Sequence, residues 1–155
     1  MSVTERMREL GLELPEVVPP VADYVPAKVH GDLVYTSGQL PMVSGALPAT
    51  GKVGDGDGLV PADDAKGYAR QSALNAVAAA AAAAGGLDRL TGVLKVTGFV
   101  ASVPAFTGQP GVINGASELL GEIFGDVGRH ARSAVGVPVL PLDSPVEVEV
   151  VFSVR

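Results

Sequence analysis

The chain has 155 residues, enough for one domain with a real hydrophobic core, and it is rich in small apolar residues but poor in aromatic ones. Its 17 acidic and 11 basic side chains give a formal net charge of −6, which argues against a broad nucleic-acid-binding surface but not against a local anion site. Because there is no cysteine, disulfides, a thiol nucleophile and a cysteine-based metal site are excluded.

The N-terminal segment, residues 1–20, is charged at first and then rich in proline. It has no apolar stretch of the kind found in signal peptides. The longest apolar run of the chain, residues 76–84, is too short and too rich in alanine to span a bilayer. We therefore expect a cytoplasmic protein with no membrane contact, in which residues 1–20 form an N-terminal extension.

A short helix is predicted over residues 4–12, with Thr4 as its N-cap. A β-hairpin is predicted over residues 28–37, because two strand-like runs flank Gly31-Asp32. This pair suits a two-residue type II′ turn, in which glycine occupies the first central position.

Residues 42–61 are rich in glycine and proline and are expected to form a surface loop. The Asp–Gly repeat within this loop could suggest calcium. It lacks the spaced carboxylates and the closing glutamate of a calcium-binding loop, so no metal site is predicted.

Two long helices with one strand between them are predicted in the middle of the chain. Asp63 or Asp64 is expected to cap an alanine-rich helix that ends near Gly85-Gly86, and its small side chains allow close packing on a sheet. Residues 90–102 have the β-branched and aromatic side chains typical of a strand. Pro110 is suited to the first turn of the second helix.

Residues 130–137 and 146–150 are predicted to form two further strands, since valine alternates with glutamate in the second of them. Arg132 lies in an almost uncharged stretch, and a buried guanidinium needs an anionic partner. That partner is either a carboxylate of this chain, such as Glu147 or Glu149, or a carboxylate or phosphate of a ligand.

The element order is therefore β-β-α-β-α-β-β, with two helices on one face of a mixed sheet. This order predicts an α+β fold. Because no linker or internal repeat is evident, residues 1–155 are expected to form a single domain.

Several short motifs share their order and spacing with a known family. They are Tyr24, Ser37-Gly38-Gln39-Leu40-Pro41, Asn75, Asn114, Ala131-Arg132-Ser133, Leu140-Pro141 and Val146-Glu147-Val148-Glu149. Together they resemble the RidA/YjgF family, also called the L-PSP endoribonuclease-like family. The resemblance runs from about residue 24 to residue 151.

The resemblance implies a fold similar to that of trimeric chorismate mutase. In that assembly the sheets of three subunits form a central barrel, and the sites lie in clefts between subunits. It also implies hydrolysis of reactive enamines and imines, such as 2-aminoacrylate, to a 2-keto acid and ammonia. No cofactor is expected, because an imine is already electrophilic.

The resemblance assigns roles to individual residues. Arg132 falls on the arginine that holds the substrate carboxylate, and Glu147 falls on the glutamate that positions the attacking water. Tyr24, Gly38 and Asn114 fall on positions that shape the same pocket.

The Ser37 side chain, next to Gly38, is also expected to bind substrate. Ser37 lacks the flanking pattern of a nucleophile elbow, so covalent catalysis through its hydroxyl is not expected.

The chain also departs from the better-known members of the family. Ala134 stands where a cysteine is frequent, and His130 stands where a proline is frequent. His130 is expected to be an exposed or hydrogen-bonded side chain. These departures indicate a divergent subgroup, in which anion binding is a firmer expectation than the identity of the substrate.

Three functions stay open at this point. The first is an enamine or imine deaminase, and the second is a non-catalytic protein that binds a 2-keto acid or another small carboxylate. The third is an endoribonuclease or translation inhibitor, which the acidic charge and the absence of a stacking aromatic cluster disfavour.

Overall fold

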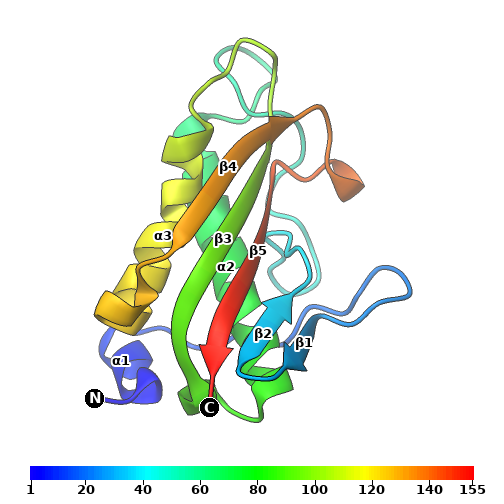
Figure 1. The fold of residues 1–155 in the computed structure, drawn as a ribbon. Helices are drawn as coiled ribbons and strands as arrows, with labels where there is room; N and C mark the ends of the chain where they lie inside the picture. Colours follow the sequence, from blue (N-terminus) through cyan, green and yellow to red (C-terminus); the bar gives the residue numbers. More distant parts are fainter.

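The computed structural model describes residues 1–155, and its five strands form one mixed sheet with the two long helices on one face (Figure 1). The strands are β1 (Ala27–His30), β2 (Leu33–Thr36), β3 (Leu90–Ala101), β4 (Ala131–Val137) and β5 (Val146–Val154), in the spatial order β1-β2-β5-β3-β4. Only β3 and β4 pair in parallel, and the other neighbours are antiparallel. The α+β fold and the β-β-α-β-α-β-β order are confirmed, and the last strand, β5, lies at the centre of the sheet.

Strands β1 and β2 form the predicted hairpin. His30 pairs with Leu33, so Gly31 and Asp32 make the two-residue turn. Gly31 has a φ of +60°, which a type II′ turn requires at this position and which glycine adopts without strain.

The N-terminal helix, α1, spans Val3–Glu9, and the prediction that Thr4 caps it was wrong. Ser2 is the N-cap. Its Oγ accepts a hydrogen bond from the Glu5 backbone N–H (3.1 Å), and Glu5 Oε2 accepts one from the Ser2 N–H (2.8 Å). This reciprocal capping box satisfies two backbone donors that the first helical turn leaves without partners.

The first long helix, α2, spans Ala62–Ala84, and the predicted aspartate cap is also wrong. Pro61 occupies the N-cap position, and Asp63 and Asp64 lie in the first turn. There their negative charges interact favourably with the positive end of the helix dipole. Gly85 ends the helix with a φ of +87°, as its position in the sequence predicted.

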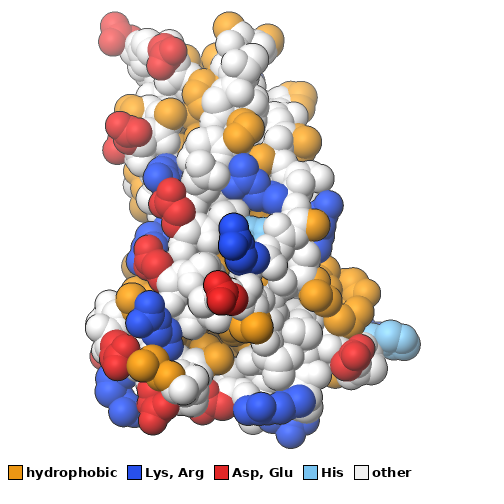
Figure 2. Space-filling view, turned by 60° about the vertical axis from the view of Figure 1, so that its left-hand side comes forward, with side chains coloured by type: hydrophobic (Ala, Val, Ile, Leu, Met, Phe, Trp, Pro, Cys, Tyr) orange, Lys and Arg blue, Asp and Glu red, His pale blue; other side chains and the backbone are white.

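Helix α2 packs closely against the second long helix, α3 (Gln109–Phe124), because Gly115 has no side chain at the contact. Ion pairs Lys66–Glu118 (3.1 Å) and Arg70–Glu122 (2.9 Å) bridge the same two helices at the surface. Figure 2 shows acidic and basic side chains interleaved on this side of the molecule, without a broad basic surface.

Replacing Gly115 with alanine is expected to destabilise the protein by about 1–3 kcal/mol, because overpacking costs more than the helix propensity gained. A Cβ at position 115 would lie 2.9 Å from the Lys66 carbonyl carbon and closer still to its oxygen, and this backbone cannot move away easily. Gly121→Ala in the same helix is the control, since its Cβ would meet nothing within 4 Å and should raise stability slightly. Urea denaturation measures both, and equal stability of the two variants would contradict the packing argument.

The two faces of the sheet differ in what covers them. Val146, Val148 and Val150 on β5 are buried beneath the helices, so the alternating Glu147 and Glu149 lie on the opposite face. No helix covers that open face in the single chain (Figure 1).

The loop over residues 42–61 is held at its middle rather than free. Val53 is fully buried, its N–H donates to the Ala101 carbonyl (2.7 Å), and its own carbonyl accepts from the Val103 N–H (3.2 Å). The loop is therefore anchored to the end of β3.

No helix of the protein, α2 included, combines the length and the apolar character that a membrane crossing requires.

Candidate functional site

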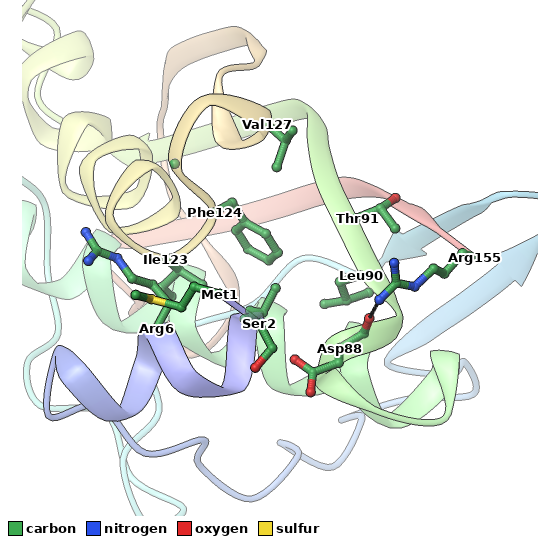
Figure 3. Close-up of a pocket in the computed structure, with 12 residues that line it drawn as sticks. Met1, Ser2, Arg6, Asp88, Leu90, Thr91, Ile123, Phe124, Val127 and Arg155 are labelled. Carbon is green, nitrogen blue, oxygen red and sulfur yellow. Dashed lines mark hydrogen bonds between the residues drawn. The ribbon is translucent and has the colours of Figure 1, made fainter.

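A cavity of about 440 Å³ opens at one end of the molecule, where α1, the start of β3 and the end of α3 meet (Figure 3). Its two arginines are engaged by backbone carbonyls: Arg6 Nε donates to Glu122 (2.9 Å), and Arg155 Nη2 donates to Asp88 (3.1 Å). None of the predicted site residues lines this cavity. They lie elsewhere, in two groups that we call the Arg132 cluster and the Glu147 pocket.

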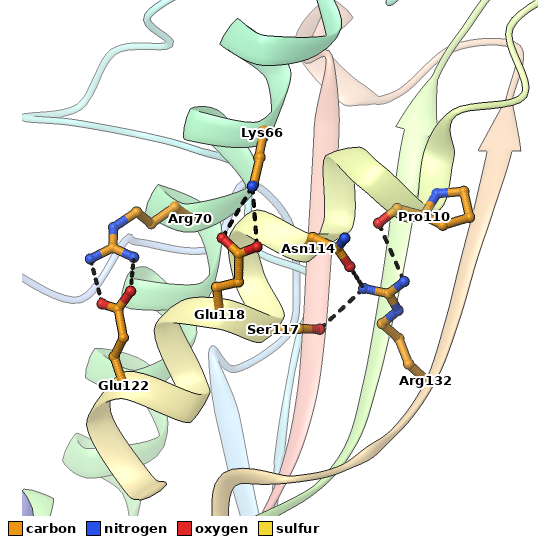
Figure 4. A network of polar contacts seen from close by, with 8 residues as sticks. All are labelled: Lys66, Arg70, Pro110, Asn114, Ser117, Glu118, Glu122 and Arg132. Atoms are coloured by element: carbon orange, nitrogen blue, oxygen red, sulfur yellow. Dashed lines mark hydrogen bonds and ion pairs between the residues drawn. The ribbon is translucent and has the colours of Figure 1, made fainter.

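The Arg132 cluster joins β4 to α3 and consists of Arg132, Asn114, Ser117, His130 and the carbonyl of Pro110. Figure 4 shows all of its members except His130. Arg132 Nη1 donates to Asn114 Oδ1 (2.8 Å) and to Ser117 Oγ (3.2 Å). Nη2 donates to the Pro110 carbonyl oxygen (3.3 Å). Three neutral acceptors therefore fix the guanidinium without cancelling its charge.

The Arg132 guanidinium keeps donors free for a ligand. Of its five N–H groups, the chain uses two on Nη1 and one on Nη2, which leaves the Nε donor and one Nη2 donor. The ion pairs of the chain are Arg6–Glu9, Lys66–Glu118 and Arg70–Glu122, so Arg132 has no carboxylate partner here. Neighbouring Nε and Nη2 donors match the two oxygens of a carboxylate.

The Glu147 pocket lies on the other side of the sheet. Glu147, Gly38, Gln39 and Tyr24 line it, together with the apolar residues 18–21 of the N-terminal extension. It is small, about 50 Å³, and its lining combines apolar residues with the polar side chains of Glu147, Gln39 and Tyr24.

The carboxyl group of Glu147 lies directly against the backbone of Gly38. A Cβ added at position 38 would come within 2.7 Å of Glu147 Cδ, so only glycine leaves room for this contact. Burial of the side chain raises the pKa of Glu147, and the neighbouring charge of Glu149 raises it further. A half-buried carboxyl group with a raised pKa is suited to act as a general base or acid.

Replacing Gly38 with alanine is expected to displace the Glu147 carboxyl group while leaving stability almost unchanged. The backbone at position 38 needs no positive φ, and the atoms in the way belong to the far end of a flexible side chain. Any turnover that depends on Glu147 should then fall at least about tenfold. Gly67→Ala, which meets open space in α2, is the control, and unchanged turnover in Gly38→Ala with this control intact would contradict the expectation.

Ser37 lies outside both groups and forms hydrogen bonds to the backbone of a neighbouring segment. Its Oγ donates to the Val25 carbonyl (2.6 Å), and its N–H donates to the Pro26 carbonyl (2.8 Å). These bonds hold the segment that carries Tyr24. The Tyr24 hydroxyl accepts a hydrogen bond from the Val21 N–H (3.4 Å), and 44% of the residue is exposed.

Strand register places Arg132 and Glu147 on opposite faces of the sheet. Arg132 pairs with Val96, which in turn pairs with Val150, and both valines face the helices. Glu147 alternates with the helix-facing valines of β5 and pairs with Phe99. An internal ion pair between Arg132 and Glu147 or Glu149, one of the two readings of the sequence, is therefore wrong.

Ser117 is the member of the Arg132 cluster that the sequence reading missed. It follows Asn114 by three residues in α3, so helical spacing already places both side chains on one face. His130 is hydrogen-bonded, as expected, and its partners are Ser117 (2.9 Å) and the Gly128 carbonyl (2.6 Å). The contribution of residues 18–21 to the Glu147 pocket carries no local sequence signal, because it depends on how the extension folds back.

The mixed five-stranded sheet with two helices on one face is the chorismate-mutase-like fold. The chain belongs to the YjgF/chorismate mutase-like endoribonuclease family, whose sequence profile matches residues 4–153. The resemblance seen in the short motifs is thus confirmed.

Similar proteins occur in distant organisms. Protein TCP17 of Trypanosoma cruzi is 41% identical over 150 residues, which cover 95% of this chain and 91% of that protein. The solved structure of Atu1372 from Agrobacterium tumefaciens, a protein of unknown function, is 41% identical with a TM-score of 0.87, covering 99% and 94% of the two chains. The structure of Escherichia coli TdcF with bound serine is 27% identical with a TM-score of 0.61, covering 91% and 92%.

Proposed function

We propose that the protein hydrolyses reactive 2-enamine and 2-imino acids, such as 2-aminoacrylate, to a 2-keto acid and ammonia. One observation carries the proposal: the Arg132 guanidinium is oriented by three neutral acceptors, has no carboxylate partner in the chain and keeps two adjacent donors free. Such a group is suited to hold a ligand carboxylate by two parallel hydrogen bonds.

In this proposal, the substrate carboxylate binds Arg132, and the imine carbon then faces Glu147. The Glu147 carboxylate accepts a proton from water as the water oxygen bonds to the imine carbon. In the tetrahedral intermediate formed from the protonated imine, Glu147 returns its proton to the nitrogen and takes up the hydroxyl proton, so that the C–N bond breaks, ammonia leaves and the C=O bond forms. An enamine such as 2-aminoacrylate first takes a proton from solvent on its terminal carbon, which gives the same protonated imine. Fixing the carboxylate lowers the barrier through orientation, so no further nucleophile is needed.

The site would need two copies of the chain, since Arg132 and Glu147 lie on opposite faces of one sheet. The Arg132 cluster of one subunit would face the Glu147 pocket of the next. Exposed apolar side chains on the open face of the sheet, Tyr35, Leu94 and Val135 among them, are suited to burial in such an assembly. The family resemblance favours a homotrimer with three equivalent sites.

Serine bound to E. coli TdcF supports the class of ligand, since serine carries a carboxylate next to a nitrogen-bearing carbon. A non-catalytic role as a receptor for 2-keto acids is the second candidate. It is favoured by the fact that the Arg132 cluster forms its hydrogen bonds without any help from Glu147.

Cleavage of RNA is less well supported. General acid–base cleavage often employs two histidines at one phosphodiester. The only two histidines here lie far apart in the fold: His30 is exposed on β1 at one edge of the sheet, and His130 precedes β4 at the other edge.

The test of the proposal is hydrolysis of 2-aminoacrylate and bulkier imino acids, generated in the assay by a lyase or an amino-acid oxidase. Acceleration by the wild-type protein supports the deaminase. Binding of pyruvate without any acceleration would favour the receptor, and neither binding nor acceleration would contradict both.

A further inference from the structure

A chain of hydrogen bonds lies behind the Arg132 guanidinium. His130 Nδ1 lies 2.6 Å from the Gly128 carbonyl oxygen, and His130 Nε2 lies 2.9 Å from Ser117 Oγ. Ser117 Oγ in turn lies 3.2 Å from Arg132 Nη1. The chain therefore connects the turn before β4 to the side chain that is suited to bind a carboxylate.

The direction of these hydrogen bonds follows from the chemistry of each group. A carbonyl oxygen only accepts, so His130 Nδ1 carries the hydrogen and donates it to Gly128. In the neutral imidazole, Nε2 is then an acceptor, and Ser117 donates its single hydroxyl hydrogen to it. Only lone pairs of Ser117 Oγ remain toward Arg132, and these are what a guanidinium N–H requires.

The Gly128 carbonyl is held in place by direct packing of its turn on α3. This turn, η2 (Gly125–Gly128), approaches the helix so closely that a Cβ at position 128 would lie 2.6 Å from the Leu120 carbonyl oxygen. Because Ser117 is on the same helix, both ends of the His130 contact are fixed to one element. The imidazole ring is thus anchored on both of its nitrogens.

We infer that His130 is a positioning residue for carboxylate recognition: through Ser117 it fixes the Arg132 guanidinium so that its free Nε and Nη2 donors point to the ligand. The inference rests on the proposed function. His130 itself does not touch the substrate. Without it, the Ser117 hydroxyl can rotate its hydrogen toward Arg132, where it opposes the N–H donor instead of accepting from it.

The experiment compares four variants in 2-aminoacrylate hydrolysis and in calorimetric binding of pyruvate. Ser117→Ala and His130→Leu are each expected to raise KM and the pyruvate Kd about tenfold, with kcat changed less than about twofold. The double variant should be no worse than either single one, because His130 acts only through Ser117. His130→Gln, whose side-chain oxygen can accept from Ser117, should restore most of the affinity.

The control is His30→Leu, at the exposed hairpin turn on the opposite edge of the sheet. It should leave KM, kcat and Kd unchanged. Additive losses in the double variant, or an unchanged Kd in His130→Leu, would overturn the positioning role while wild-type turnover and Arg132-dependent binding persist. If the wild type neither binds pyruvate nor hydrolyses the imine, the proposed function fails, and the inference fails with it.

Discussion

Replacing Arg132 with alanine is expected to weaken the binding of pyruvate and other small carboxylates by about 100-fold or more, because two charge-assisted hydrogen bonds are lost together. Arg132→Lys should recover only part of the affinity. Lysine keeps the positive charge but cannot present the two parallel donors of the fork, nor reach Asn114 and Ser117 at the same time. Isothermal titration calorimetry on the assembled protein measures both effects.

Stability should respond little to the same replacement. The acceptors that Arg132→Ala releases are near the surface, where water can replace the lost bonds, so a loss of at most about 1 kcal/mol is expected. Arg129→Ala is the matched control, since Arg129 is exposed and lies three residues before Arg132. Equal loss of binding in both variants would mean that general positive charge, rather than the oriented fork, attracts the ligand.

Replacing Glu147 with glutamine is expected to lower kcat by about 100-fold or more while leaving pyruvate affinity nearly unchanged, because general-base catalysis is lost but the Arg132 cluster is intact. In the wild type, kcat should fall on the acidic side as Glu147 becomes protonated. Since burial raises the pKa of Glu147, this fall should be centred above the usual range of glutamic acid.

Glu149→Gln provides the matched control for that pH profile. The charge of Glu149 contributes to the raised pKa of Glu147, so its removal should move the acidic limb to lower pH and leave kcat at neutral pH unaltered. If the fall of kcat at acidic pH does not move in Glu149→Gln and persists in Glu147→Gln, then a group other than Glu147 causes it.

The same raised pKa gives Glu147→Gln a signature in stability. The folded state binds the Glu147 proton more tightly than the unfolded state does, so this group contributes stability at low pH and loses that contribution as pH rises through the folded pKa. Glutamine should therefore stabilise the protein slightly at neutral pH, by less than about 1 kcal/mol after screening by water, and not at pH below the unfolded pKa. Thermal unfolding at two pH values checks the sign.

Much of the fold was predictable because its signals are local. The Gly31-Asp32 turn, the end of α2 at Gly85 and the alternating valines of β5 each follow from a few adjacent residues. The N-caps of α1 and α2 were not predicted correctly, since Ser2 and Pro61 lay just outside the expected helices, whereas Pro110 does lie in the first turn of α3. The fold depended less on these caps than on the apolar pattern of the strands.

That Arg132 and Glu147 lie on opposite faces of the sheet could not be predicted from the sequence alone. Each lies in a strand whose alternation shows two faces, but β4 is an edge strand with little burial on either side, so its pattern does not indicate which face meets the helices. That assignment depends on the parallel pairing of β4 with β3, a contact between distant segments. Asn114 and Ser117, by contrast, were within reach of simple helical spacing.

The most direct test of a site shared between subunits is to combine two inactive variants in one assembly. Arg132→Ala and Glu147→Gln proteins are unfolded together in equal amounts, refolded and assayed for 2-aminoacrylate hydrolysis. If each site combines Arg132 of one subunit with Glu147 of another, random assembly restores about one quarter of wild-type activity, since that fraction of sites receives two intact halves. Activity no higher than that of the separate variants, in mixtures shown to contain both subunits, would contradict a site shared between copies of the chain.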